Sequence, residues 1–143
     1  MKKLLASCAL AAMSFALAPL AAMAAEAQCP LRNATLHGTY VVSGTGTIVG
    51  VGPIAAVGEH TYDGQGHTVA TYTLSVNGTI IKGVTVTGTY TVNPDCTMSL
   101  AESDGSTYDF VVAPDGRTTT WINTGTGTVV SGTEVRLKSP DSE

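Results

Sequence analysis

Two histidines on either side of one predicted turn are the first residues whose types and spacing could support chemistry. His60 and His67 flank the turn signal Asp63–Gly66. A four-residue loop over Asp63–Gly66 would pair Tyr62 with His67 and place His60 on the same face of the hairpin. A protein zinc site takes at least three protein ligands, and no third one occurs at matching spacing. Threonines share this face, so we predict a solvated surface and no metal site.

Glu59 is the one charged residue whose position in the strand alternation points it toward the interior. In the same register it shares a face with Val57 and lies near Tyr72. A buried carboxylate is costly unless it is paired, so an inward Glu59 would mark a ligand-binding or proton-transfer site. It is therefore our candidate catalytic acid or base. The alternative is that Glu59 reaches water at the strand end or pairs with Arg136.

Aromatic side chains form the second group of candidates, because they can line an apolar binding cavity. Together with Glu59, the predicted ligand-binding residues are Tyr72, Tyr90, Tyr108 and Phe110. Tyr40 and Trp121 could line the same cavity. At least half of these aromatic side chains are expected to be ordinary core.

The sequence contains no local motif for cofactor or nucleophile chemistry. It has no H-E-x-x-H, G-x-S-x-G or P-loop motif. Its Asp-Gly pairs lack the D-x-D-x-D-G spacing of a calcium loop. We therefore predict no cofactor and interpret the Asp-Gly pairs as turns.

Tight turns alternate with runs of Thr, Val, Ile and Tyr, which is the composition of β-strands. No window shows apolar residues at helical spacing, and glycine recurs too often for a long helix. The turn signals are Asp63-Gly64, Asn77-Gly78, Asn93-Pro94-Asp95, Asp104-Gly105 and Asp115-Gly116. The predicted strands are 39–48, 54–62, 67–76, 79–82, 84–93, 97–102, 107–113, 118–124 and 128–138.

These strands predict an all-β fold, a single antiparallel up-and-down meander that closes into a roughly eight-stranded barrel. The segments 79–82 and 84–93 can form one bent strand with a bulge at Gly83. A β-sandwich is the alternative. A Greek-key sandwich needs at least one long crossover, however, and every connection here is short.

The hairpin around Asp104 has a predicted register. A three-residue loop over 103–105 would place Met98 and Leu100 opposite Tyr108 and Phe110.

The alternation over 84–92 predicts which face is buried. Valines and Tyr90 share one face, and four threonines share the other. An outer-membrane barrel would instead show an apolar band and aromatic girdles facing lipid. We therefore predict a soluble protein with no membrane association after export.

The N-terminus has the parts of a secretory signal peptide. Lys2 and Lys3 precede an uncharged stretch that ends in the cleavage pattern Ala22-Met23-Ala24. A retained anchor is the alternative, although Pro19 interrupts the stretch, and Cys8 would leave with the signal. The expected organisation is a signal peptide (1–24), a lead-in (25–37), a barrel domain (38–138) and a disordered tail (139–143).

Cys29 and Cys96 remain after removal of the signal, an even count in an exported chain. Such a pair predicts one disulfide. It would close a loop of about 68 residues and contribute roughly 4 kcal/mol in the chain-entropy model. Two buried free thiols are the alternative. Export predicts that the mature protein is periplasmic or secreted.

The mature chain is acidic, with five basic and eleven acidic side chains once Lys2 and Lys3 are removed. Nucleic acids and anionic lipids are bound through clustered Lys and Arg, and the sequence has no such cluster. We therefore predict no nucleic-acid partner, and the composition leaves the oligomeric state open.

The chain contains a D-G-x-G turn, an N-G turn and the segment Gly88–Thr97, which reads G-T-Y-T-V-N-P-D-C-T. This pattern resembles a family of small exported bacterial proteins of uncharacterised function, over most of the mature chain. The resemblance implies a calycin-like or allene-oxide-cyclase-like barrel of eight antiparallel strands. It implies no activity and no catalytic residue.

Three function classes follow from a barrel of this kind. The leading hypothesis is non-enzymatic binding of a small apolar ligand in the lumen. A cyclase- or isomerase-like enzyme would use the cavity shape and Glu59 as its acid or base. A structural or protein-interaction module of the cell envelope would use the exterior, which is rich in Thr and Gly.

Overall fold

The computed structural model describes residues 28–138, so the predicted signal peptide and C-terminal tail lie outside the described residues. The described chain forms one short 3-10 helix and eight strands. They are η1 (Arg32–Thr35), β1 (Gly38–Ile48), β2 (Gly52–Tyr62), β3 (His67–Val76), β4 (Thr79–Val92), β5 (Thr97–Glu102), β6 (Thr107–Val112), β7 (Thr118–Asn123) and β8 (Thr128–Arg136). No helix within this range is long and apolar enough to cross a membrane.

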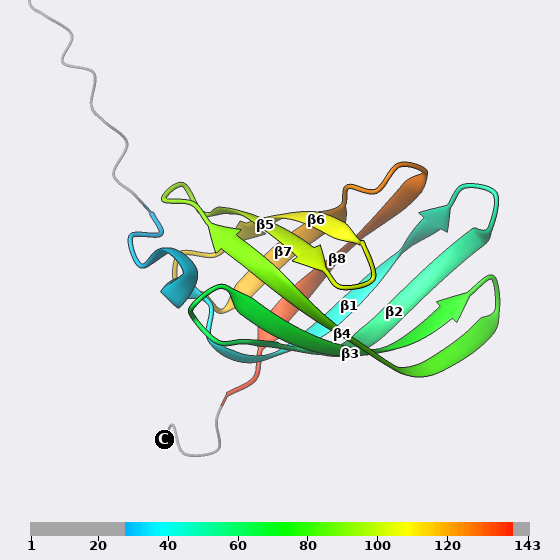
Figure 1. Cartoon of the computed structure of the whole chain (residues 1–143), viewed down its shortest axis with the longest axis horizontal. Helices are drawn as coiled ribbons and strands as arrows, with labels where there is room; N and C mark the ends of the chain where they lie inside the picture. The colour runs from blue at the N-terminus through cyan, green and yellow to red at the C-terminus, as the bar shows by residue number, and fades with distance from the viewer. Residues whose placement is uncertain (1–27, 139–143) are drawn as a thin grey trace, which may run out of the picture.

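The eight strands form one closed antiparallel barrel, in which each strand pairs with its neighbours in sequence (Figure 1). Pairing of β1 with β8 closes the sheet, from Tyr40 opposite Arg136 to Ile48 opposite Thr128. The predicted meander and barrel are confirmed, and the alternative sandwich is wrong. Short connections allow each strand to pair only with the next one, and closure leaves no unpaired edge.

Strand β4 is the single bent strand that the sequence predicts. Its register against β3 shifts between Tyr72 and Leu74, opposite Gly83, which has φ +67°. Beyond this bulge Val86 and Tyr90 are buried, whereas the intervening threonines are exposed. The bulge therefore lets one continuous strand keep its apolar residues on the inner face.

The hairpin between β5 and β6 also has the predicted register. Met98 lies opposite Phe110, and Leu100 lies opposite Tyr108. The loop is closed by Gly105, whose φ of +89° suits glycine.

The hairpin between β2 and β3 differs from the prediction by one residue. Tyr62 pairs with Thr68 rather than with His67. Asp63 itself pairs with His67, because its N–H donates to the His67 carbonyl at 3.1 Å. Oδ1 of Asp63 accepts the backbone N–H groups of residues 65–67. The carboxylate thus stabilises Asp63 and His67 as the last pair of the hairpin, and residues 64–66 form a three-residue loop.

This one-residue difference exchanges the two faces of β2 relative to β3, since side chains alternate with period two. Glu59 is exposed and lies opposite Thr71 on the outer face, so the prediction of an inward Glu59 is wrong. His60 is only 1% exposed, so the predicted solvated position of His60 is also wrong. His67 is exposed, as expected.

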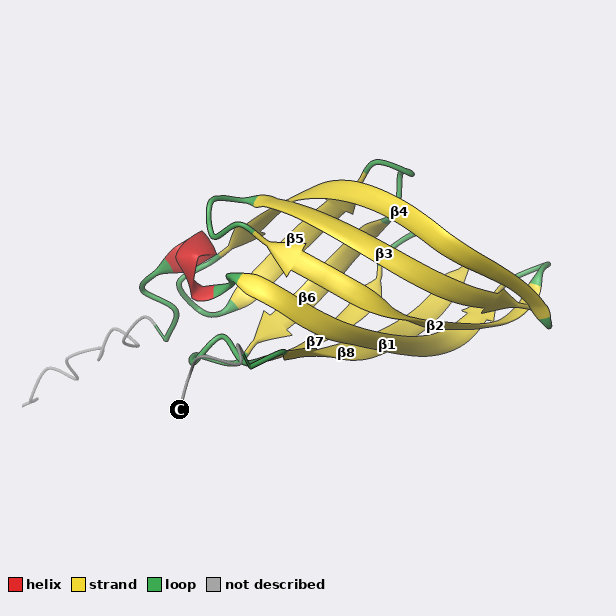
Figure 2. Cartoon of the chain, turned by 90° about the horizontal axis from the view of Figure 1, so that it is seen from below, coloured by secondary structure: helices red, strands yellow, loops and turns green. Residues whose placement is uncertain are grey.

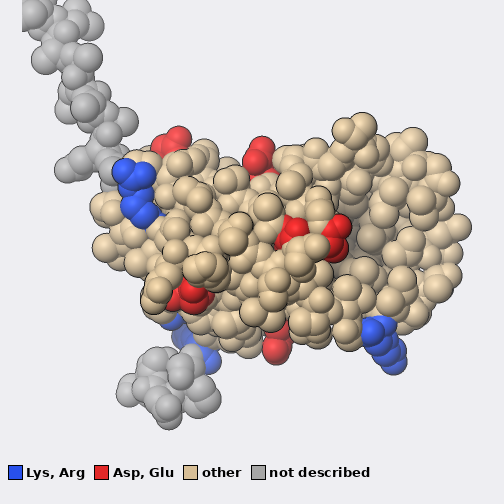
Figure 3. Space-filling model, viewed as in Figure 1, with Lys and Arg blue, Asp and Glu red and all other residues tan. Residues whose placement is uncertain are grey.

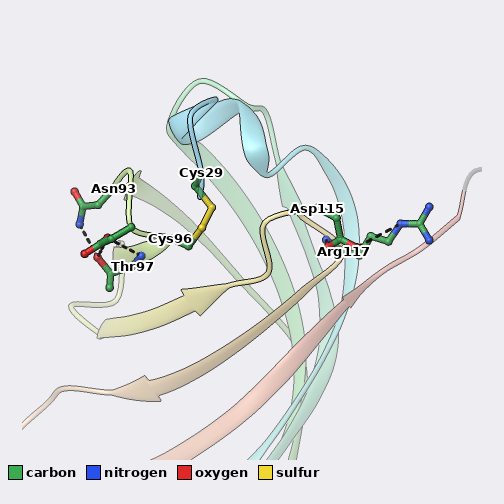
Figure 4. The surroundings of a disulfide bond; sticks show 7 residues. Cys29, Asn93, Cys96, Thr97, Asp115 and Arg117 are labelled. Atoms are coloured by element: carbon green, nitrogen blue, oxygen red, sulfur yellow. Dashed lines mark hydrogen bonds and ion pairs between the residues drawn. A yellow bond between two sulfur atoms is a disulfide. The ribbon is translucent and has the colours of Figure 1, made fainter. Parts of the chain in front are cut away.

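The segment that precedes β1 covers one end of the barrel (Figures 1 and 2). The predicted disulfide between Cys29 and Cys96 attaches it to the β4–β5 turn (Figure 4). Leu36 is fully buried, and the Tyr90 hydroxyl donates to the Asn33 and Leu36 carbonyls at 3.1 and 3.2 Å. The free-thiol alternative is wrong, and this end of the barrel is closed.

Two paired glycines make room for Trp121 inside the barrel. Gly44 of β1 lies opposite Gly132 of β8. A Cβ added at either glycine would lie 2.4–2.5 Å from the indole ring. The indole therefore packs against bare backbone, which only glycine permits.

Candidate functional site

A cavity of about 220 Å³ occupies the barrel lumen. His60 and Glu134 border it at the buried end, and Ile48, Asp104 and Thr128 border it beside the turns at the other end. Most of the remaining lining is aliphatic or aromatic. Acidic side chains lie beside a hollow in the face drawn in Figure 3. The lumen is thus an apolar space with a few polar groups.

Two larger depressions lie on the outside of the barrel. One of about 570 Å³ extends over β5–β8, and one of about 580 Å³ extends over β3–β5. Most of their lining consists of outward-facing residues such as Thr120 and Thr87. They are open surface, so we place the candidate site in the lumen, which is more enclosed.

A buried hydrogen-bond network forms the polar floor of the lumen. Nδ1 of His60 lies 2.9 Å from Oε1 of Glu134. The Tyr62 hydroxyl and Thr119 Oγ1 donate to Oε2 of Glu134 at 2.9 and 3.1 Å. All four residues are at most 2% exposed. Three groups therefore converge on one carboxylate from β2 and β7.

The partners of Glu134 assign the tautomer of His60. As a carboxylate Glu134 can only accept, so its contact with His60 is assigned as a donation from Nδ1–H. The Tyr62 hydroxyl, which donates to Oε2, also lies 3.1 Å from this Nδ1. Nε2 of His60 is buried and has no hydrogen-bond partner among the described residues. In neutral His60 this nitrogen carries a lone pair, the state of a proton acceptor or general base.

Glu102 is a second buried carboxylate in the lining. It is 7% exposed, and its Oε1 accepts a hydrogen bond from the Tyr72 hydroxyl at 2.9 Å. Burial raises the pKa of Glu102, while the hydrogen bond from Tyr72 and the nearby His60 oppose this rise. Burial and the Glu102 charge in turn raise the pKa of Tyr72 well above its usual range. They also raise the pKa of Tyr108 to about 12.

The structure brings together some of the predicted site residues and separates others. Among the predicted ligand-binding aromatic residues, those in the cavity lining are Tyr72, Tyr108 and Phe110. Trp121 lies in the same lining. Tyr90 packs at the closed end, where its hydroxyl is used by η1. Glu59 lies outside the barrel, so Tyr90 and Glu59 are not part of this site.

Sequence reasoning did not place three buried polar residues, Glu102, His60 and Glu134, in the cavity lining. The alternation of Met98 and Leu100 extends by two residues to Glu102, which was a usable signal. Placing His60 on the inner face required the correct β2–β3 register. Placing Glu134 required the register of β8 against β1, which the sequence analysis did not predict.

The lining groups suit acceptor and proton-transfer roles more than metal binding. Across residues 28–138 no three His, Cys, Asp or Glu side chains are grouped to hold a metal ion. Nε2 of His60 and the Glu102 carboxylate can each accept a hydrogen bond from a ligand. The site can therefore orient a small molecule that carries a donor group.

Comparisons of the chain with protein-family models, curated protein sequences and solved structures found no match. The eight-stranded antiparallel barrel is consistent with the calycin-like architecture that the sequence resemblance implies. No finding supports membership of the exported bacterial family itself.

Proposed function

We propose that the protein is exported and binds a small, mostly apolar molecule in its barrel lumen. The observation that carries this proposal is the apolar cavity of about 220 Å³, closed at one end by the segment before β1. Export is supported by the disulfide, which persists in oxidising compartments.

Small inward-facing residues explain why the lumen has room for a ligand. An eight-stranded barrel is just wide enough for side chains to fill it. Here the missing side chains of Gly44 and Gly132 leave room for the Trp121 ring, and Ala56, opposite Gly44, borders the cavity with only a methyl group. Pockets for drug-sized ligands span roughly 300–1,000 Å³. The expected ligand is therefore smaller than a drug molecule.

Filling the lumen tests this proposal. Ala56→Phe places a ring in the cavity, whereas Ala55→Phe places the same ring on the outer face of the same strand. Trp121 is the only tryptophan and lies in the lining, so its fluorescence reports binding directly.

We expect 2-phenylethanol to cause a saturable change in Trp121 emission in the wild type and in Ala55→Phe. Affinity should fall by about tenfold or more in Ala56→Phe, because the ring occupies the binding volume. Equal affinities in the two variants, or no saturable change in the wild type, would contradict lumen binding. Native mass spectrometry of protein from its own host would identify a co-purifying ligand.

A second candidate function is proton transfer by His60. It is favoured by one observation, the buried His60–Glu134 pair whose Nε2 has no partner. This pair takes the role that the sequence assigned to Glu59. Nε2 would accept a proton from carbon next to a carbonyl, and the imidazolium would return a proton from solvent.

The proton-transfer candidate predicts exchange of the α-protons of phenylacetone in D₂O, observed by NMR. The rate should exceed that of buffer and should be lost in His60→Gln, while Glu59→Gln should retain it. A wild-type rate equal to that of buffer would exclude this reaction for phenylacetone and favour simple binding.

A further inference from the structure

We propose that the lumen ligand is a small organic cation, a protonated amine on an apolar body, whose N–H groups bind Glu102 and Nε2 of His60. This inference rests on the proposed function, since it names the class of molecule that the lumen binds.

The charges of the lining favour a cation. The cavity is bordered by three acidic side chains, Glu102, Asp104 and Glu134, and its lining contains no Lys or Arg. In Figure 3 the basic side chains on the visible face lie toward the periphery of the described chain, away from the hollow. A cleft lined by one sign of charge concentrates ligands of the opposite sign.

Glu102 has no counter-charge paired with it among residues 28–138. It forms no ion pair with any described residue, and its carboxylate accepts a hydrogen bond from the neutral Tyr72 hydroxyl. An unpaired buried carboxylate is unfavourable, and burial raises its pKa accordingly. An ammonium group in the cavity would supply the missing counter-charge and a charge-assisted hydrogen bond.

Nε2 of His60 is an independent second acceptor. Its burial without a partner is unrelated to the charge of Glu102 and itself indicates a missing donor. Tyr72 lies beside both groups, because its hydroxyl contacts Glu102 and its ring centroid lies 6.4 Å from that of His60. An ammonium group, with three donors, can satisfy two acceptors bordering one small cavity.

Aromatic rings complete a site for a cation with an apolar body. The rings in the lining are Tyr72, Tyr108, Phe110 and Trp121. Tyr108 and Trp121 pack edge to face at 5.5 Å between ring centroids. Ring faces attract cations electrostatically, and the aliphatic lining favours the remaining part of the ligand.

The amine should bind the ionised form of Glu102, which determines the pH dependence. The pKa of Glu102 is raised, so affinity should be lost as pH falls through that raised value. The groups that face Glu102 are Tyr72, His60, Asp104 and Tyr108. The tyrosines stay neutral over this range.

Three probes with the same aromatic body test the inference. They are phenethylamine, which is cationic, 2-phenylethanol, which is neutral, and 3-phenylpropanoate, which is anionic. Each is titrated into the full-length mature protein at pH 7.5 and at lower pH, with Trp121 fluorescence and calorimetry as readouts. We expect phenethylamine to bind about tenfold or more tighter than 2-phenylethanol, and 3-phenylpropanoate to bind most weakly.

Glu102→Gln keeps the shape of the side chain and removes its charge. It should lower the affinity for phenethylamine by about tenfold and change the affinity for 2-phenylethanol by less than about twofold. Glu59→Gln is the matched control, because it removes the same charge from the outer face and should change neither affinity. If Glu102→Gln does not fold, the wild-type pH profile replaces it: amine affinity should fall with pH while alcohol affinity stays constant.

The outcomes separate this inference from the proposed function. Equal affinities for the alcohol and the amine would leave the proposal of lumen binding intact and overturn the inference that the ligand is a cation. Equal weakening of all probes in Glu102→Gln would also overturn it, because Glu102 would then only shape the cavity. If none of the probes binds, both the proposal of lumen binding and the inference of a cationic ligand are overturned.

Discussion

Glu134 connects side chains from β2 and β7 through one buried carboxylate. It accepts hydrogen bonds from His60, Tyr62 and Thr119, and all three donors are buried. Tyr62 also packs edge to face against Tyr40 and Tyr90 near the closed end. The network therefore links the floor of the cavity to the aromatic core beneath it.

Glu134→Gln should lower the free energy of unfolding by about 3 kcal/mol, because an amide cannot accept from all three donors and leaves a buried group unsatisfied. Urea melts at pH 7 measure this change. Glu59→Gln, an identical substitution on the outer face, should stay within about 0.5 kcal/mol of the wild type. A stable Glu134→Gln protein would show that the network contributes little.

The contrast between Glu59 and His60 shows how far single side chains could be predicted. The sequence shows that these two neighbours lie on opposite faces of the strand. Which of them faces the lumen depended on whether Asp63 belongs to the loop or to the strand. Three backbone N–H groups donate to the Asp63 carboxylate. These hydrogen bonds, with that from the His67 N–H as the largest cause, lower the pKa of Asp63 to about 2. A turn signal does not encode this side-chain bond.

The segment before β1 is attached to the barrel without pairing to any strand of the sheet. It has no place in the sheet, and η1 covers only one turn. The disulfide, a hydrogen bond from Cys29 N–H to the Pro94 carbonyl and a bond from Val92 N–H to Asn33 attach it to the barrel. This segment keeps the lumen closed at one end.

Removal of the disulfide should destabilise the protein by roughly 4 kcal/mol, because the bond restricts a long loop in the unfolded chain. Cys29→Ser with Cys96→Ser, compared with the wild type in urea melts, measures the loss. Intact mass after alkylation of the unfolded protein, with and without reduction, provides the control. Two alkylatable thiols without reduction would contradict the bond.

The molecule as a whole combines a hydroxyl-rich exterior with an apolar, partly hollow interior. Its exterior also exposes valines on several strands, among them Val41, Val69 and Val111. The interior alone contains the buried polar groups that face a cavity, which is why both proposals place the ligand there. Closure of the sheet surrounds that interior with strands on all sides.

Local sequence was sufficient for the strands, the turns, the bulge at Gly83 and the pairing of consecutive strands. These features depend on residues close together in the chain, where turn chemistry and period-two alternation act. The site depended on contacts that only the closed barrel creates. His60 and Glu134 are 74 residues apart and meet because β8 pairs with β1, which lies beside β2. The sequence predicted that the sheet closes, but no local pattern sets the register of β8 against β1, since this register depends on the summed twist and coiling of eight strands.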